Sequence, residues 1–429
     1  MPLDSSKAGQ FGEVGVSGLT QFSGYVAEEH LSRLSYTKWR DELRIMLAND
    51  PVICSLNTVI EMLARQVSWK LAPADDSNAA AELRAFFEEA LFNDTERTWQ
   101  EHLSEIITFL QWGWSWHEIV YKRRGGDSRD PRLSSRFSDG RIGWRKFAGR
   151  SQDSLDRWKF SGDDDVTAMI QRGPNTGDEY VIPAAKSLHF RTTAAKNNPE
   201  GRSMYRGAYR PWYFKSRIEN VEAIGIERDL AGLPVMYVPA EIMKNTASPA
   251  ESALRNEMLD VVRKIRRDEN EGVILPALHD KDGHRLFELT LLSTGGQRQF
   301  DTDKIIARYD QRILMTGLAD FLLLGSQKVG SYALSTDKTS LFATALEAHL
   351  DSVCEKFNMQ AIPELARLNG MNRDLLPKLE HGEVDRISFT ELCEAVNRLS
   401  GAGITFDEDQ QNWIKAQGKL PATQTTGEQ

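Results

Sequence analysis

The sequence is poor in cysteine and contains no long apolar run. Its three cysteines, Cys54, Cys354 and Cys393, lie far apart and lack the paired spacing of a disulfide framework or a zinc ribbon. We therefore expect buried free thiols in a reducing compartment. No apolar run reaches the ~18 residues that a membrane helix needs, and the first residues do not resemble a signal peptide. These absences predict a soluble protein without a membrane partner.

An excess of positive charge is also absent. The 429 residues carry 53 Lys and Arg against 62 Asp and Glu, a formal net charge of -9. Because no overall basic field attracts phosphates, tight and static binding of nucleic acid is disfavoured. Apolar residues make up 40% of the chain, enough for substantial cores in roughly two or three domains.

The common enzyme signatures are missing. The phosphate loop GxxxxGK[ST] and the motifs GxGxxG, HExxH and GxSxG do not occur. His117 and Glu118 form half of a zinc motif, which we interpret as two structural strand residues. Asp163, Asp164 and Asp165 could hold a divalent cation, although three consecutive carboxylates are more typical of a solvated turn. A metal-dependent DNA-processing enzyme, nuclease-like or terminase-like, that uses these aspartates is therefore the alternative function.

Tryptophans gather in one region of the sequence. The members of this group are Trp112, Trp114, Trp116, Trp144 and Trp158. Such rings can serve as stacking platforms for bases, or they can pack the core of a large domain. The low basicity of the chain favours the core.

The first half of the chain is patterned as an α+β domain. Glycines at positions 9, 12, 15, 18 and 24 among small polar residues predict a flexible N-terminal arm. Asp50 before Pro51 is typical of a helix start, an acidic N-cap followed by proline at the first helical position. Alternating apolar residues predict a strand over 67–71. The remaining patterns predict helices over about 76–92 and 98–112, a strand over 113–124, and short strands up to about 191.

Two long helical patterns bracket a small α/β module in the second half. The first covers 203–234, where Pro211 either opens or kinks the helix. The second covers about 301–324. Between them, the capping box at 248–251 predicts a helix to about residue 267, and 280–283 has the composition of a hairpin turn.

The stretch FLLLGSQKVGSYALSTDKTSLF, residues 321–342, changes character at Gly325. There the apolar run stops, and apolar spacing resumes only at Leu341. Lys328 precedes the second glycine and no strand leads into the stretch, so we do not interpret it as a phosphate-binding loop. We expect a long connection and then a helix that begins near Leu341. Two later capping boxes, at 388–391 and 405–408, predict a helical hairpin before a polar tail.

Five stretches along the chain carry a resemblance to a known family. They are MLANDPVICSLNTVIEMLARQVSWKLAP (46–73), FLQWGWSWHEIVYKRR (109–124), NPEGRSMYRGAYRPWYFK (198–215), IERDLAGLPVMYVP (226–239) and FTELCEAVNRLSGAGITFDEDQQNWIKAQGKLP (389–421). In this order they resemble a tailed-bacteriophage portal protein, most closely the Mu-like class. Each stretch is a soft pattern, and the specificity comes from their collinear order.

The resemblance implies an α+β portal fold that assembles as a ring. Carried over region by region, it divides the chain into a flexible N-terminal arm (1–29), an α/β wing (30–202), a stem helix (203–231), a small α/β clip (232–299), a second stem helix (300–324), a channel loop (325–338), a wing helix (339–370), a helical crown (371–421) and a disordered tail (422–429).

The implied function is a dodecameric channel at one capsid vertex for the packaging and ejection of double-stranded DNA. No enzymatic activity, metal or cofactor is implied. The implied partners are further copies of the chain in a ring of about 12, the terminase large subunit, a head-completion or adaptor protein, the major capsid protein, and DNA that passes non-specifically. The implied location is the virion, with the host cytoplasm during assembly.

Two groups of residues would face the DNA in such a channel. The channel loop contributes Gly325, Ser326, Gln327, Lys328, Val329, Gly330 and Ser331. On the polar side of the second stem helix, Lys304, Arg308 and Arg312 would line the channel. An ordinary solvated or inter-subunit face is the alternative for these three cations.

Overall fold

The computed structural model describes residues 15–35, 37–162, 164–173, 176–231, 233–244, 248–264, 279, 282–283, 285, 287–292, 301–320 and 332–384. The chain divides into two compact units, residues 1–206 together with 317–429, and residues 207–316. Both units contain helices and strands, which confirms the mixed α+β class. Among the described residues, no helix combines the length and the apolar character needed to cross a membrane.

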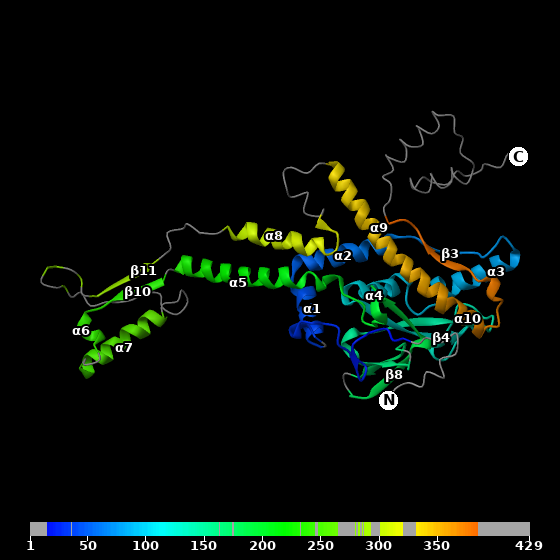
Figure 1. Cartoon of the computed structure of the whole chain (residues 1–429), viewed down its shortest axis with the longest axis horizontal. Helices are drawn as coiled ribbons and strands as arrows, with labels where there is room; N and C mark the ends of the chain where they lie inside the picture. The colour runs from blue at the N-terminus through cyan, green and yellow to red at the C-terminus, as the bar shows by residue number, and fades with distance from the viewer. Residues whose placement is uncertain are drawn as a thin grey trace, which may run out of the picture. The chain divides into compact units, whose positions relative to one another are not determined.

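Helices and small antiparallel sheets build the first unit (Figure 1). Its helices are α1 (Thr37–Asn49), α2 (Pro51–Gln66), α3 (Asn78–Glu88), α4 (Trp99–Trp112), α9 (Tyr332–Lys356) and α10 (Ile362–Leu368). Its strands are β1 (Gln21–Phe22), β2 (Tyr25–Val26), β3 (Trp69–Ala72), β4 (Trp114–Arg123), β5 (Ile142–Arg150), β6 (Leu155–Phe160), β7 (Val166–Arg172), β8 (Glu179–Pro183), β9 (Ser187–Arg191) and β12 (Lys378–His381). The sheets have the orders β5-β4-β9, β6-β7-β8, β1-β2 and β12-β3.

The predicted helix starts of the first unit are confirmed by their caps. The Asp50 carboxylate accepts hydrogen bonds from the backbone N of Val52 and Ile53, at 3.0 and 3.1 Å, with Pro51 at the first helical position. Helix α4 begins with a capping box that Thr98 forms with its third helical residue. These side chains satisfy backbone N–H groups that the first helical turn leaves free.

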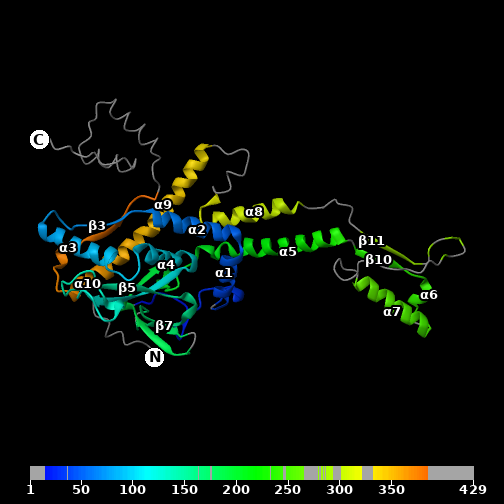
Figure 2. The ribbon, with the colours of Figure 1, turned by 180° about the vertical axis from the view of Figure 1, so that it is seen from behind.

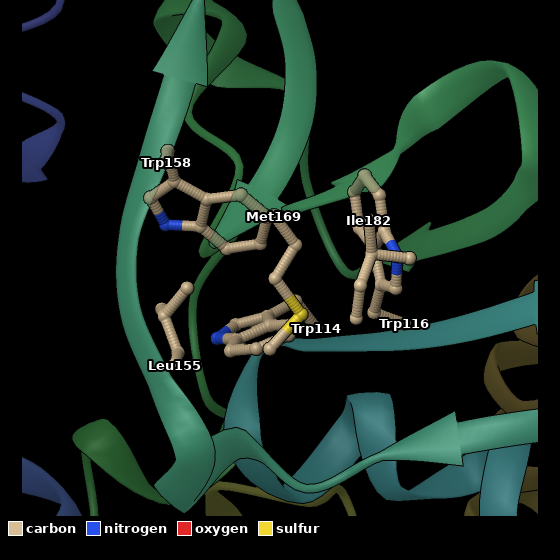
Figure 3. Packing of buried hydrophobic residues seen from close by; sticks show 6 residues of the cluster. All are labelled: Trp114, Trp116, Leu155, Trp158, Met169 and Ile182. Atoms are coloured by element: carbon tan, nitrogen blue, oxygen red, sulfur yellow. The ribbon is translucent and has the colours of Figure 1, made fainter. Parts of the chain in front are cut away.

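Four of the five tryptophans, all except Trp112, are buried in the first unit, as expected, and three of them share one cluster (Figure 3). The cluster consists of Trp114, Trp116, Leu155, Trp158, Met169 and Ile182, all buried, and it joins strand β4 to the β6-β7-β8 sheet. The rings of Trp114 and Trp158 meet edge to face with centroids 4.9 Å apart. Buried rings in such contact are not available to stack on bases.

The N-terminal segment differs from the expected flexible arm. Its residues 21–26 form the β1–β2 hairpin, and the carbonyl of Gly24 accepts a hydrogen bond from N of Trp158 at 2.9 Å. Gly24 has φ of 90°, and a Cβ there would lie 2.1 Å from the Trp158 carbonyl oxygen, so glycine permits the close approach. Further along, Glu29 accepts two hydrogen bonds from Arg206, at 2.5 and 2.7 Å. Residues 21–29 thus make contacts with the rest of the first unit that the glycine-rich composition did not predict.

The second unit contains two long helices and a small α/β module. Its elements are α5 (Tyr209–Ala231), β10 (Leu233–Tyr237), α6 (Ala240–Met243), α7 (Pro249–Lys264), β11 (Glu288–Leu292) and α8 (Thr302–Met315). Strands β10 and β11 pair antiparallel. Pro211 lies in the first turn of α5, where its missing N–H costs nothing. The two ends of this unit meet, since a methyl group added at Gly207 would lie 3.3 Å from Cγ2 of Thr316.

The predicted second stem helix (300–324) is too long. Helix α8 ends at Met315, and N of Thr316 donates to the carbonyl of Ile313 at 3.1 Å, which tightens the last turn. Leu318 then has φ of 57°, a left-handed conformation that no helix continues through. The apolar residues after Met315 gave the sequence a helical period that the backbone does not follow.

The end of the first unit contains a strand that the sequence did not predict. Strand β12 pairs antiparallel with β3, so that Leu379 lies opposite Leu71. We predicted a boundary between the wing helix and the crown at residue 371. Strand β12 lies after this residue but pairs with β3, so it belongs to the same sheet as a wing strand. The two predicted capping boxes and the polar tail lie beyond residue 384, outside the described residues.

Candidate nucleic-acid interface

Helices α5 and α8 lie side by side and antiparallel in the second unit (Figure 1, Figure 2). Thr302, at the start of α8, donates its hydroxyl hydrogen to Glu222 of α5. The rings of Phe214 and Tyr309 stack with centroids 6.5 Å apart. The residue nearer the start of α8 contacts the residue nearer the end of α5. The two helices therefore run antiparallel.

A buried ion pair joins the same two helices. Nζ of Lys215 lies 2.6 Å from Oδ1 of Asp310, and the Lys215 side chain is 3% exposed. An ammonium removed from water in this way needs a close counter-charge, because burial penalises an unpaired charge strongly. Sequence reasoning missed this pair, since its members lie in different helices and carry no local signal.

The three predicted stem cations form an exposed row on α8. Lys304, Arg308 and Arg312 recur every four residues, a spacing that places them on one side of the helix. Lys304 lies 2.8 Å from the N-cap residue Asp301, whose hydrogen bond raises the pKa of Lys304. The guanidinium carbons of Arg308 and Arg312 lie 5.4 and 5.9 Å from the ring centroid of Tyr309. The Tyr309 ring therefore contacts both arginines of the row and, on α5, the ring of Phe214.

This row has the chemistry of a weak phosphate contact. One α-helical step of four residues advances about 6 Å. Phosphates along one strand of duplex DNA advance ~3.4 Å per nucleotide, so neighbouring cations match about every second phosphate. Three exposed cations at this spacing are compatible with weak phosphate contacts. The same geometry suits a solvated or inter-subunit face equally well.

The predicted loop residues fall mostly outside the described part of the chain. Gly325, Ser326, Gln327, Lys328, Val329, Gly330 and Ser331 all belong to this undescribed stretch. The backbone is helical from Tyr332, where α9 begins. The predicted channel loop (325–338) is therefore too long at its C-terminal end, because 332–338 are helical.

The aspartates of the alternative function make contacts within the fold. Oδ2 of Asp164 accepts a hydrogen bond from the Ser17 hydroxyl at 3.3 Å, and Oδ1 of Asp165 accepts one from the Asn197 amide at 3.0 Å. Asp163 lies outside the described residues. Within the described part of the chain, no group of three His, Cys, Asp or Glu side chains is placed to hold a metal ion.

His117 and Glu118 lie in strand β4, as we interpreted them. Burial lowers the pKa of His117 to about 3, so the imidazole is neutral at physiological pH. Lys186 donates to the carboxylate of Glu118 at 2.9 Å. Both residues are therefore structural.

The described cysteines are free thiols. Sγ of Cys54 donates to the carbonyl of Leu47 at 2.9 Å, and burial raises the pKa of Cys354 to about 12. A thiol with such a pKa is unreactive at neutral pH. Cys393 lies outside the described residues.

The substitution Lys215→Met tests the buried ion pair. We expect it to lower the free energy of unfolding of the second unit by about 2–3 kcal/mol, because Asp310 loses its counter-charge in a largely buried place. The matched control is Lys304→Met, whose side chain is 85% exposed and whose loss should cost less than ~0.5 kcal/mol. Urea unfolding followed by circular dichroism measures both. Equal costs for the two variants would contradict the role of the buried pair.

Comparison with known proteins identifies the family. The sequence matches a family model described as the portal protein of Mu bacteriophage over residues 41–417. Among curated proteins, no match was found. One similar solved chain comes from the virion of a native gene transfer agent (GTA) particle, with a TM-score of 0.54 at 12% identity over 90% of this chain and 94% of that chain. Another comes from the neck of an empty GTA particle computed with C6 symmetry, with a TM-score of 0.51 at 12% identity over 90% and 95%.

The two kinds of match carry different weight. At 12% identity, the solved structures support a shared fold and nothing finer. The family model, in contrast, covers most of the sequence. The chain belongs to the Mu bacteriophage portal protein family and is a structural, non-enzymatic component of the virion that serves DNA packaging at a capsid vertex.

Proposed function

We propose that about a dozen copies of this chain form a ring whose central channel passes double-stranded DNA during packaging and ejection. The observation that carries this proposal is the match to the Mu portal family model over residues 41–417. The exposed row of Lys304, Arg308 and Arg312, on a helix that a buried ion pair fixes to its neighbour, is compatible with it. A cation row on a rigid helix pair suits a wall along which a duplex slides. The six-fold symmetry in the description of one GTA neck adds support for a ring with a multiple of six subunits.

Helix dimensions are compatible with a ring of this size. Twelve helices of ~10 Å diameter standing side by side have a circumference of ~120 Å through their axes. The diameter of that circle is ~38 Å, which leaves a bore of ~28 Å. Such a bore passes a duplex with little space to spare.

The negative net charge of the chain favours a channel in which DNA slides rather than one that binds DNA tightly. A net charge of -9 per chain gives a ring of twelve a charge of roughly -108, which repels DNA at long range. Each phosphate contact holds the duplex and releases counterions, so a channel for moving DNA benefits from few of them. Three cations on α8 and Lys328 in the loop provide a sparse set that centres the duplex.

The remaining regions receive roles from the family resemblance. Residues 30–202 and 332–370 form the wing, 203–231 and 300–315 the stem, 232–299 the clip, 325–331 the channel loop and 371–421 the crown, except that β12 pairs with β3 of the wing. The clip docks the terminase large subunit during packaging and a head-completion or adaptor protein afterwards. The major capsid protein is a further partner of the ring.

Deleting the channel loop tests the DNA path. Removal of Ser326–Ser331 stops short of α9, so we expect rings to assemble as in the unaltered protein. We expect the amount of DNA retained per head to fall roughly tenfold, because the loop no longer contacts the phosphate backbone. Quantitative PCR on nuclease-treated heads measures retention, and negative-stain images measure assembly. A variant that replaces only Lys328 with Ser keeps the loop length and separates charge from shape.

Two outcomes of these experiments contradict the proposal. Loss of the rings on deletion would make the loop an assembly element. A purified protein that stays monomeric and cleaves plasmid DNA with added Mg²⁺ would support the nuclease-like alternative instead.

A further inference from the structure

One short segment of the first unit has a charge opposite to that of the chain. Between residues 122 and 150, ten side chains are Lys or Arg and three are Asp, while the whole chain has a net charge of -9. The segment consists of the end of β4, the loop 124–141 and strand β5. None of the comparisons assigns a role to it.

Most of these cations already have a carboxylate partner. The pairs are Lys122 with Asp94, Arg124 with Glu89 and Asp139, Arg132 with Asp130, Arg141 with Asp139, Arg145 and Lys146 with Glu96, and Arg150 with Glu118. Within the described part of the chain, Arg123, Arg129 and Arg136 have no ion pair. All three are exposed. We call these three residues the arginine patch.

A buried carboxylate fixes the loop that carries the patch. The Asp94 side chain is 1% exposed and lies 3.1 Å from Nζ of Lys122. It also accepts hydrogen bonds from the hydroxyl of Ser135, at 2.9 and 2.8 Å, and from N of Arg136, at 3.1 Å. The hydroxyl oxygen of Ser135 in turn accepts a hydrogen bond from N of Phe137 at 3.1 Å. The backbone beside Arg136 is therefore held by a satisfied polar network.

A buried arginine closes the base of the same loop. The Arg124 side chain is 1% exposed and lies 2.6 Å from Glu89 and 3.1 Å from Asp139. Its guanidinium also lies between two rings, 4.1 Å from the centroid of Phe137 and 4.9 Å from that of Phe86. The loop is thus held by two buried charged side chains, Asp94 and Arg124. The support orders the loop before any partner binds.

We propose that the arginine patch binds the phosphate backbone of double-stranded DNA at a site in the first unit. Guanidinium groups pair with phosphate oxygens in bidentate geometry. The family's function in DNA packaging supplies duplex DNA as a polyanion that this protein meets. The contact reads no sequence, because it touches only the backbone. The site consists of other residues than the stem cations, which belong to the second unit, and than the channel loop, which is a different segment of the first unit.

Fluorescence anisotropy with a labelled 30-base-pair duplex tests the patch in the full-length protein. From 50 to 200 mM NaCl, we expect the double variant Arg129→Ala/Arg136→Ala to lower the salt slope of the affinity by ~1.8 and to weaken binding at 0.1 M NaCl at least tenfold. The matched control is Arg65→Ala/Arg84→Ala. It removes the same charge from exposed arginines that are ion-paired to Glu61 and Glu88, and it should change affinity less than twofold.

A charge-neutral variant tests the support of the loop. Ser135→Ala removes the hydroxyl that contacts Asp94, so we expect affinity to fall two- to fivefold with the salt slope unchanged. Unaltered affinity in this variant would overturn the claim that the buried network positions the patch. Equal losses in the two double variants would overturn the site itself, because bulk charge would then explain binding. Binding of a fluorescent poly-glutamate peptide, but not of the duplex, would overturn DNA in favour of an acidic protein surface.

Discussion

Lowering the pH from 7 to 4.5 is expected to reduce the free energy of unfolding of the first unit by about 5 kcal/mol through His117 and His189 alone. Burial lowers the pKa of each imidazole to about 3. In the unfolded chain the pKa of histidine is about 6.5. The unfolded state therefore binds protons below pH 6.5 that the folded state does not bind, and stability rises with pH through this range. At pH 4.5 each histidine contributes about 2.6 kcal/mol of this loss.

The substitution His189→Asn isolates one of the two contributions. The His189 ring stacks on Trp158 with centroids 5.5 Å apart, and its Nε2 lies 2.8 Å from the carbonyl of Pro199. Asparagine can donate to that carbonyl but does not titrate. We expect the variant to be less stable at pH 7, because ring packing is lost, and to lose about 2.5 kcal/mol less than the unaltered protein between pH 7 and 4.5.

Guanidinium unfolding curves at both pH values measure this difference. Carboxylates also titrate here; burial raises the pKa of Glu200, for example, which stabilises the fold as the pH falls. Comparing the two proteins cancels such shared contributions. An unchanged difference between pH 7 and 4.5 in His189→Asn would mean that the buried imidazole does not couple folding to protons.

The substitution Gly113→Ala is expected to destabilise the first unit by about 2–5 kcal/mol. Gly113 ends α4 with φ of 96°, a left-handed conformation that costs other residues roughly 1–2 kcal/mol. An added Cβ would also lie 2.4 Å from the carbonyl oxygen of Glu200 and 2.9 Å from N of Ser203. Both neighbours are backbone atoms that cannot rotate away, so overpacking adds roughly 1–3 kcal/mol.

A second glycine provides the control for this experiment. Gly125 follows strand β4, and an added Cβ there meets no atom within 4 Å. Gly125→Ala should therefore change the free energy of unfolding by less than ~0.5 kcal/mol. Thermal and denaturant unfolding of both variants measure the difference. Similar small effects in both would show that the chain end of α4 relaxes around the new methyl group.

Local signals predicted the parts of the fold that depend on neighbouring residues. Asp50 before Pro51 predicted a helix start because the cap and the proline act on the next turn. The pattern over residues 113–124 predicted a strand, and β4 spans Trp114–Arg123. The row on α8 was predicted in the same way, from a four-residue period.

Contacts between distant residues could not be predicted from such signals. Glycines near the N-terminus are typical of a flexible segment, and only the fold reveals that Gly24 packs against Trp158. Strand β12 is four residues long and pairs with a strand from the other end of the sequence. Helix α9 begins among serines and threonines that have no apolar period to detect. Asp310, the partner of Lys215, could not be predicted either, because the two residues lie in different helices.

The meeting of Gly207 and Thr316 has an evolutionary consequence. Because the two ends of the second unit are close together, residues 207–316 form an insertion in the first unit. A short linker could replace this inserted module. Relatives can lengthen, trim or exchange that module while the fold of the first unit is kept. The proposed clip lies within this module, so its sequence can diverge independently of the first unit. A chain in which residue 206 is joined to residue 317 by a few glycines and serines should yield the first unit as a protein of its own.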